Sequence, residues 1–279
     1  MSPRSTLNRP PGSSKSLQKA IRILLHLGEN GPDMSLTQFA SALRLNKTTV
    51  HRLLRALQKF HLVERNPHSE KFRLGLKFHA LGARSVLWRS LPCDARPFLV
   101  ELSRRSDETA ILAIPGAAGI ICLDSVNVSS ALLMVRLLPG DFIPAHCTAL
   151  GRAILSWLPD AEVHAILTRW GMHRYTSNSC DRPRDLRYAL EVHRRNGYAA
   201  DHGELEDGLV SFAAPILYRG NRIVGSIGVS GPQDRFLLVR AKMKIDLVKN
   251  FAAKLSKLFS RGPAEFATIS PPYVSQNLE

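Results

Sequence analysis

The chain has 279 residues, of which 44% are hydrophobic, and its formal net charge is +15. This length and composition suffice for two globular domains, each with its own core. No segment reaches the roughly 18 apolar residues of a membrane-spanning helix, and the polar N-terminal segment does not resemble a secretory signal. The four cysteines form no CxxC pair, which argues against a disulfide framework or a zinc ribbon. We therefore expect a cytoplasmic protein without a membrane partner.

The positive charge is concentrated at the N-terminal end. Residues 1–90 contain 16 basic and 4 acidic side chains, a net charge of +12, whereas residues 91–279 contain 22 and 19, a net charge of +3. A confined positive field attracts polyanions, and the release of their counterions supplies affinity. A charge that only maintained solubility would not need this confinement. The asymmetry therefore favours nucleic acid as a partner.

Three helices and a β-hairpin are predicted for the N-terminal end. Apolar residues recur with a helical period in three segments, residues 16–27, 36–43 and 46–60. In the first of these, the apolar stripe consists of Leu17, Ala20, Ile21, Leu24, Leu25 and Leu27. Ser35 and Asn46 are the candidate N-caps of the second and third. Alternating residues on either side of a polar turn then predict a short hairpin, with its turn at residues 66–70.

The third predicted helix has one apolar face and one cationic face. At 100° per residue, the apolar side chains fall within about 60° of one another, and they are Val50, Leu53, Leu54 and Leu57. No acidic residue occurs between Asp33 and Glu64, so the opposite face lacks the mixed charges that stabilise ordinary surface helices. The alternative is a merely solvated helix, but an acid-free face repels itself unless a polyanion covers it.

The second and third helices, separated by a three-residue break, have the spacing of a helix-turn-helix, whose second helix enters the major groove of DNA. The candidate DNA contacts on the third helix are Lys47, Thr48, Thr49, His51, Arg52 and Arg55. The hairpin would form a wing whose tip contacts the backbone or minor groove through His68, Ser69 and Lys71. Phosphate contacts are also expected from Lys15 and Ser16. Alternatively, Thr49 bonds only to its own helix and Arg52 lies across the core.

Helices and strands alternate in the remainder of the chain, which predicts an α+β or α/β domain. A helical connector over residues 77–88 is expected to end before Pro92, and a separate helix to begin at Pro97. The further predicted strands cover residues 109–114, 119–125, 131–137, 209–218 and 222–230, and the further helices cover residues 147–157, 161–169, 183–196 and 237–259. We accordingly divide the chain into a disordered tail, a DNA-binding domain, a helical linker, a second domain and a second tail, at residues 1–14, 15–76, 77–91, 92–260 and 261–279.

Three N-terminal segments carry a resemblance to known proteins: KSLQKAIRILLHL, SLTQFASALRLNKTTVHRLLRALQKFHLVER and KFRLGLKFHALG. They are similar to the winged helix-turn-helix of the IclR-type bacterial transcription regulators. The resemblance resumes in PAHCTALGRAIL, GYAADHGELEDGLVSFAAPI and IVGSIGVSGP. It implies a DNA-binding regulator, not an enzyme, that acts on double-stranded promoter DNA as a homodimer or homotetramer. The chain departs from the family at Arg44, where glycine is common. A left-handed arginine costs roughly 1 kcal/mol, so the turn either tolerates this cost or avoids it by changing shape.

The resemblance also implies a GAF-like second domain, with a central antiparallel sheet, that binds one small carboxylate-bearing effector. Residue by residue, its pocket would be lined by Ala149, Leu150, Asp201, Ser211, Gly228 and Ser230. The residues themselves add Thr148, because free backbone amides at a helix start bind anions. Ser211 replaces a common cysteine, and Gly228 replaces a common serine, which would remove a hydroxyl and open space in the pocket. We therefore expect an effector bulkier than a two- or three-carbon acid, such as an aromatic acid. The alternative is that Ser211 and Ser230 only bond to nearby backbone.

Two other functions remain as alternatives. His146 next to Cys147, together with Asp201, would suit an enzyme with a basic localisation domain, but no oriented base lies at a telling spacing. RNA binding would require exposed aromatic residues, which the basic segment lacks. We expect neither a cofactor nor a metal, because no metal-ligand spacing connects His164, Cys180 and His202.

Overall fold

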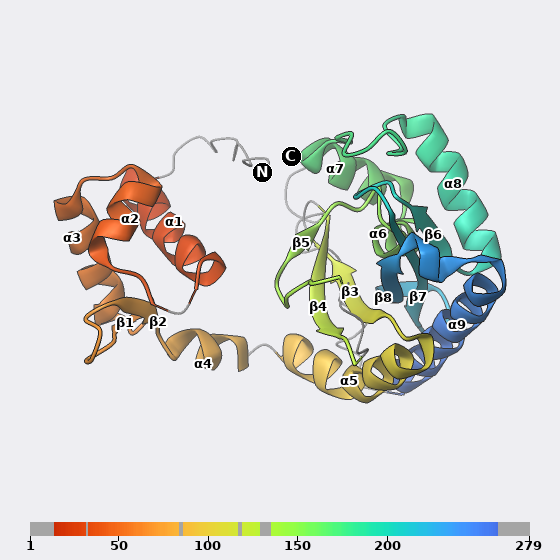
Figure 1. The fold of residues 1–279 in the computed structure, drawn as a ribbon, viewed down its shortest axis with the longest axis horizontal. Coiled ribbons are helices and arrows are strands. Elements are labelled where there is room, and N and C mark those ends of the chain that lie inside the picture. Colours follow the sequence, from red (N-terminus) through yellow and green to blue (C-terminus); the bar gives the residue numbers. More distant parts are fainter. Residues whose placement is uncertain (1–13, 32, 84–85, 117–118, 129–134, 262–279) are drawn as a thin grey trace. The chain divides into compact units, whose positions relative to one another are not determined.

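The computed structural model describes residues 14–31, 33–83, 86–116, 119–128 and 135–261. The chain divides into two compact units between Arg89 and Ser90 (Figure 1). Nearly all of both predicted tails falls outside the described residues, as does most of the strand predicted for residues 131–137; the described residues 135–138 are not part of a strand.

The N-terminal unit contains the predicted helices and hairpin. Its elements in chain order are α1 (Lys15–Glu29), α2 (Leu36–Leu43), α3 (Lys47–Lys59), β1 (Val63–Arg65), β2 (Phe72–Leu74) and α4 (Lys77–Ala83). Strands β1 and β2 pair antiparallel. The core is a single apolar cluster to which each of α1, α2, α3 and the hairpin contributes, represented by Ile23, Phe39, Leu54, Val63 and Phe72. The winged helix-turn-helix expectation is thus confirmed.

Helix α1 buries only half of the predicted stripe. Leu27 lies in the core together with Ile23, and Ala20 and Leu24 pack against it, as predicted for Leu27, Ala20 and Leu24. Leu17, Ile21 and Leu25 are instead 57%, 46% and 52% exposed, because apolar residues surround much of α1 and periodicity alone does not say which of them meet the core. The exposed stripe is available for a contact outside this unit.

Local hydrogen bonds set the turn between α2 and α3. The Ser35 side chain accepts from the Gln38 amide (3.3 Å), and the Gln38 side chain accepts from the Ser35 amide (2.8 Å), which completes a capping box. Asn46 occupies the N-cap position of α3, but its side chain makes no capping hydrogen bond. Between them Arg44 adopts φ 52° and ψ 47°, so the turn accepts a left-handed arginine instead of changing shape.

The second unit is built on one antiparallel sheet, six-stranded in the described part of the chain, with the order β5-β4-β3-β8-β7-β6. Its strands are β3 (Thr109–Pro115), β4 (Ile120–Val126), β5 (Phe142–Ile143), β6 (Ala199–His202), β7 (Leu209–Tyr218) and β8 (Arg222–Pro232). Its helices are α5 (Val86–Ser106), α6 (Ala149–Leu155), α7 (Asp160–Trp170), α8 (Pro183–Asn196), the 3-10 helix η1 (Gln233–Phe236) and α9 (Leu238–Ser260). The sheet class was predicted correctly, whereas the short strand β6 was not predicted.

Alternation along β8 separates the two faces of this sheet. The Ser226 hydroxyl donates to the Leu150 carbonyl on α6 (3.0 Å), so Ser226 and the residues two and four further along face α6. Helix α9 runs along β7 and β8 (Figure 1). On its side, Phe98 of α5 packs edge-on against Phe251 of α9. The face toward α6 is therefore the one that can hold a cavity.

Helix α5 contradicts the predicted break at Pro92. It is one helix from Val86 to Ser106 and contains both Pro92 and Pro97. An internal proline removes a helical hydrogen bond and costs about 3 kcal/mol. The helix continues because one buried stripe with helical spacing crosses both prolines, and its members are Leu91, Ala95, Leu99 and Leu102. Packing of this stripe outweighs the local signal from the prolines.

Candidate functional site

Helix α3 presents an exposed cationic surface. Val50, Leu53, Leu54 and Leu57 are buried, as the helical wheel predicted. On the opposite side the exposed residues are Lys47, Thr48, His51, Arg52, Arg55 and Lys59, with Thr49 half-buried between the two faces. Neither Arg52 nor Arg55 forms an ion pair with a described residue, so both guanidinium groups are free to meet an anion.

The other predicted contacts of this unit lie on two separate elements. Lys15 and Ser16 are exposed in the first turn of α1, which packs against α3. His68, Ser69 and Lys71 are exposed at the turn of the β1–β2 hairpin. Phe60, at the end of α3, is 69% exposed, so the expectation that this basic segment exposes no aromatic ring was wrong. Phe78 on α4 is 37% exposed as well, but two rings on separate elements are not the stacking platform of a single-strand reader.

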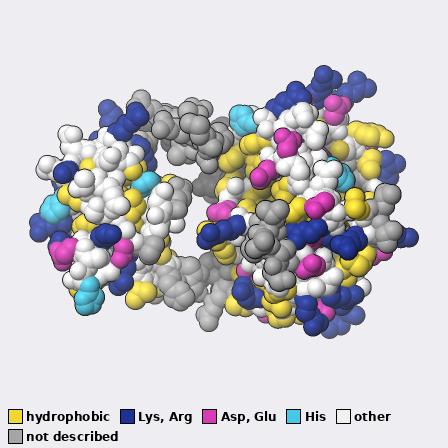
Figure 2. All heavy atoms as spheres, viewed as in Figure 1, with side chains coloured by type: hydrophobic (Ala, Val, Ile, Leu, Met, Phe, Trp, Pro, Cys, Tyr) yellow, Lys and Arg dark blue, Asp and Glu magenta, His cyan; other side chains and the backbone are white. Residues whose placement is uncertain are grey.

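The hairpin is closer to electrical balance than α3. The Asn66 side chain accepts from the His68 and Ser69 amides and donates to Asp33 (2.8 Å). Arg65 forms an ion pair with Glu70. Glu64 forms an ion pair with Arg73 (3.6 Å), and Figure 2 shows acidic side chains among basic ones on the visible face of this unit. The wing therefore attracts phosphate less strongly than α3 does.

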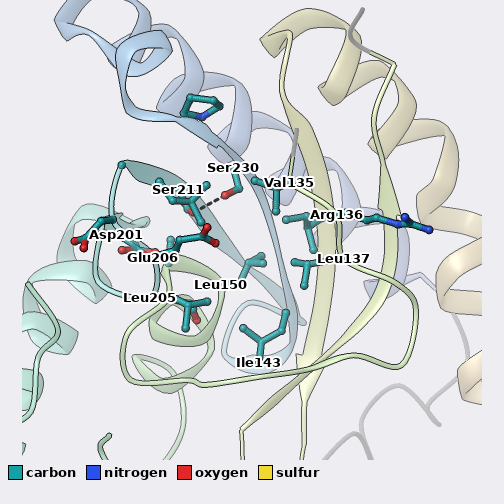
Figure 3. A pocket seen from close by; sticks show the side chains of 17 residues that line it. Val135, Arg136, Leu137, Ile143, Leu150, Asp201, Leu205, Glu206, Ser211 and Ser230 are labelled. Carbon is teal, nitrogen blue, oxygen red and sulfur yellow. Dashed lines mark hydrogen bonds between the residues drawn. The ribbon is translucent and has the colours of Figure 1, made fainter. Parts of the chain in front are cut away.

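The second unit holds a cavity of about 440 Å³ between α6 and the sheet. Six of the seven predicted effector residues line it, namely Thr148, Ala149, Leu150, Asp201, Ser211 and Ser230 (Figure 3). They come from α6, β6, β7 and β8, so strands distant in sequence meet at one site. This volume is within the range of pockets that enclose small-molecule ligands.

Gly228 is not among the residues that line the cavity. A Cβ at this position would lie 2.6 Å from the Phe212 carbonyl oxygen and 2.9 Å from the Ala213 Cβ on the neighbouring strand. Glycine therefore allows β7 and β8 to approach closely. The idea that Gly228 enlarges the pocket by removing a hydroxyl is wrong for this reason.

The start of α6 leaves backbone donors available. The Thr148 hydroxyl donates to the Pro144 carbonyl (2.7 Å) and accepts from the Gly151 amide (3.2 Å). The amides of Ala149 and Leu150 have no hydrogen-bond acceptor among the described residues. Both residues line the cavity, so these two N–H groups can serve an oxygen of a bound molecule.

The cavity also contains a carboxyl group with an altered acidity. Asp201 is 2% exposed, and one of its oxygens accepts from the Glu204 amide (2.9 Å). The pKa of Asp201 is raised from 3.8 to about 7, mainly by burial and also by the Glu204 carboxylate, while that amide bond and Arg152 act to lower it. At neutral pH a large fraction of Asp201 is thus protonated and can donate a hydrogen bond.

Ser211 and Ser230 face each other across β7 and β8 at the cavity wall. Their hydroxyl oxygens are 2.8 Å apart, and both residues are buried (Figure 3). The alternative that each bonds only to nearby backbone is therefore not what the structure shows. Since one hydroxyl donates to the other, the hydrogen of the second is left for another acceptor.

Most of the remaining lining was not predicted. Val135, Arg136 and Leu137 come from the segment after β4, and the loop after β6 adds Leu205, Glu206, Asp207 and Gly208. Ile111, Ile143, Leu209 and Pro232 complete the wall. The one signal that could have found the loop is its position directly after Asp201 in the sequence GELEDG. Arg136 is a basic residue in a lining that also contains three acidic ones.

An ion pair fixes the loop that carries this acidic lining. Arg152 on α6 is 5% exposed; its Nη1 donates to Glu204 (2.5 Å), and its Nε donates to the His146 carbonyl (2.7 Å). The Cys180 amide also donates to Glu204 (3.1 Å). Glu204 therefore joins α6 to two loops.

His146 and Cys147 are not arranged as a catalytic pair. The His146 ring donates through Nε2 to the His173 carbonyl (2.9 Å), and burial lowers its pKa. Burial raises the pKa of the Cys147 thiol to about 12, so the thiolate that nucleophilic attack needs is suppressed. In the described part of the chain, no cluster of His, Cys, Asp or Glu could hold a metal ion, and no helix is long and apolar enough to span a membrane.

A winged helix-turn-helix with an acid-free reading helix, followed by an α+β domain with a ligand-sized cavity, is the architecture of an effector-responsive DNA-binding regulator. Comparison with known proteins agrees. The model of the bacterial transcriptional regulator IclR C-terminal domain matches residues 89–257, and that of the IclR helix-turn-helix domain matches residues 16–67. The chain belongs to the IclR family of bacterial transcription regulators, whose members are DNA-binding proteins and not enzymes.

Individual relatives cover most of the chain. The HTH-type transcriptional regulator XynR of Escherichia coli (strain K12) is 30% identical over 217 residues, 77% of this chain and 85% of XynR. The crystal structure of an IclR regulator from Alicyclobacillus acidocaldarius has a TM-score of 0.73 and 26% identity, covering 89% of this chain and 99% of that one. An IclR homolog from Microbacterium hydrocarbonoxydans, complexed with 4-hydroxybenzoate, has a TM-score of 0.76, 19% identity and coverage of 89% and 100%.

Proposed function

We propose that residues 15–76 read promoter DNA and that residues 92–260, connected through the linker 77–91, make this reading dependent on an effector. The predicted contacts on α3, α1 and the hairpin would be divided between groove and backbone. Lys47, Thr48, Thr49, His51, Arg52 and Arg55 would enter the major groove, as the second helix of a helix-turn-helix does. The exposed cationic face of α3, with its unpaired Arg52 and Arg55, is the observation that carries this proposal.

The effector is proposed to be a small organic acid. One of its carboxylate oxygens would accept from the free amides of Ala149 and Leu150, and another from protonated Asp201 or the spare serine hydroxyl. Glu206 and Asp207 also line the cavity, and they repel a carboxylate placed near them. The acid group is therefore expected at the α6 end, away from that loop.

An aromatic acid suits the size of the cavity better than pyruvate does. The volume of about 440 Å³ corresponds to about fifteen water molecules, which is much more than a three-carbon acid fills. Apolar side chains, including Ile111, Leu137 and Leu150, would pack against a ring. The 4-hydroxybenzoate bound by the homolog from Microbacterium hydrocarbonoxydans is an acid of this class.

Calorimetric titration of the full chain tests the effector class. We expect 4-hydroxybenzoate and benzoate to bind more tightly than pyruvate and glyoxylate. Benzamide, which has the shape of benzoate without its charge, is the matched control and is expected to bind more weakly. Tighter binding of pyruvate would reject the aromatic class, and equal binding of benzamide and benzoate would reject the anion site.

Asp201 makes a pH dependence expected. Neutral Asp201 donates to a carboxylate, whereas ionised Asp201 repels it, so affinity should fall as pH rises through the raised pKa of about 7. If only the protonated form binds, the dissociation constant of benzoate increases about tenfold from pH 6 to pH 8. Asp201→Asn keeps a donor and removes the titration, so its affinity should be constant over this range. A pH-independent wild type, or an Asp201→Asn variant that retains the dependence, would contradict the assignment.

We also propose that the regulator is a homodimer, or a dimer of dimers. The DNA-binding domains of two subunits match a two-fold symmetric operator. The exposed residues Leu17, Ile21 and Leu25 on α1 offer an apolar surface for a subunit contact. Effector binding would change DNA affinity through a coupling of about 1–3 kcal/mol. Sedimentation equilibrium distinguishes these assemblies from the 30.9 kDa monomer.

A further inference from the structure

Arg44 lies in the turn between α2 and α3 with a backbone conformation that arginine rarely adopts. At φ 52° and ψ 47° it is the C-cap of α2, and its amide donates to the carbonyls of Ala40 and Ser41. In this region the Cβ atom crowds the residue's own backbone, so glycine or asparagine would occupy the position with less strain. The shape of the turn therefore does not explain an arginine.

The side chain has no role within the fold that would explain it either. Arg44 is exposed, and its guanidinium makes no hydrogen bond, ion pair or ring contact with any residue that the structure describes. Arg219 provides a comparison, because it is also left-handed, with φ 49°. Its guanidinium lies over the Tyr218 ring, 5.3 Å from the centroid, so Arg219 does have an intramolecular contact.

Arg44 lies close to the start of α3, whose exposed cationic side is proposed to bind DNA. It is three residues before Lys47, the first residue of α3, and Asn46, Lys47 and Thr48 are exposed after it. Asp33 bonds to Asn66 of the hairpin turn, and Glu70 pairs with Arg65. Residues 34–63 contain no acidic side chain that could neutralise Arg44. In a helix-turn-helix this end of the second helix approaches the DNA. Backbone strain persists most often where it serves function.

We propose that Arg44 contacts a DNA phosphate at the edge of the groove that α3 enters. This proposal rests on α3 being the reading helix. A phosphate contact positions the protein and carries no sequence information. Arg44 thus increases affinity for DNA, although its left-handed backbone strains the turn. Replacing it with a residue that tolerates this conformation should therefore weaken DNA binding without lowering the stability of the fold.

Arg44→Asn in the full chain tests this, because asparagine tolerates the left-handed region but is uncharged. Operator affinity at 50 mM salt, measured by fluorescence anisotropy, should fall about 3- to 10-fold. The slope of the logarithm of the binding constant against the logarithm of salt concentration should become shallower by about 0.9 per bound DNA-binding domain. The thermal unfolding midpoint should be unchanged or higher. Arg44→Lys keeps the charge and should keep the salt slope.

Arg219→Asn is the matched control, since it removes one left-handed arginine and one charge from the other unit. It should leave operator binding and the salt slope unchanged. If Arg219→Asn weakens DNA binding as much as Arg44→Asn does, the effect comes from net charge alone and the proposal is overturned. Unchanged DNA binding by Arg44→Asn would overturn it as well. If Arg52→Ala also leaves DNA binding unchanged, the assignment of α3 fails; if only Arg44→Asn does so, the phosphate contact alone fails.

Discussion

Replacing both Arg52 and Arg55 with alanine is expected to lower operator affinity by about 100-fold or more. Each guanidinium that reads a base edge contributes about 1–3 kcal/mol, and each phosphate contact adds to the salt dependence. Because both side chains are exposed and unpaired with described residues, their loss should leave stability nearly unchanged. Fluorescence anisotropy with operator and scrambled DNA, at 50 to 200 mM salt, measures both effects.

The matched control removes the same charge from the second unit. Lys254 and Lys257 are exposed on α9, and Lys254→Ala with Lys257→Ala should change operator affinity little. The Arg52 and Arg55 variant should also bind benzoate as the wild type does, since the cavity lies in the other unit. Loss of DNA and effector binding to the same extent would contradict separate roles of the two units.

Arg152→Met is expected to destabilise the second unit by about 3–5 kcal/mol, which is the usual cost of leaving one charge of a buried pair uncompensated. Arg152 is 5% exposed, and it is the partner of Glu204, whose side chain is 12% exposed. Urea unfolding of the full chain, followed by tryptophan fluorescence, measures this loss. Effector affinity should fall as well, because Glu204 precedes the loop that lines the cavity through Glu206 and Asp207.

A double variant shows whether the pair itself is responsible. In Arg152→Met with Glu204→Leu no charge remains unpaired, and apolar replacement of a buried pair is often neutral for stability. We expect the double variant to recover most of the stability that the single variant loses. A single variant that costs less than about 1 kcal/mol, as exposed pairs do, would show that this pair is not a determinant of the fold. A double variant as unstable as the single one would point to lost packing instead.

Local sequence signals were sufficient where one element determines its own structure. Periodicity located α2, α3 and the hairpin, and the asymmetric charge identified the face of α3 that stays exposed. The conformation of Arg44 was not decided by the sequence, because a turn with arginine in place of glycine could either accept the left-handed region or change shape. In the second unit, the bounds of α8 and β7 were predicted correctly because each is long and strongly patterned.

Of the six predicted residues that line the cavity, five were named from the sequence only because a family resemblance placed them together; Thr148 came from its position at a helix start. Periodicity would not have joined Leu150, Asp201, Ser211 and Ser230, which lie on four different elements. The resemblance also placed Gly228 in the pocket, and this was wrong. Glycine is needed there because a side chain would collide with the Phe212 carbonyl oxygen on the neighbouring strand. Strand register determines such distances, and register is a property of the assembled sheet.

By itself, the sequence determined the two-unit division of charge, the helices of the reading head and the class of protein, because these depend on residue type and spacing along one segment. Tertiary structure alone decided that α5 continues through Pro92 and Pro97, which apolar residues of α1 are buried, and that the Asp201 carboxyl titrates near pH 7. Each of these depends on the solvent exposure of a group in the folded protein and on the residues that pack against it. Burial and packing come from segments far apart in the chain, so no local pattern encodes them.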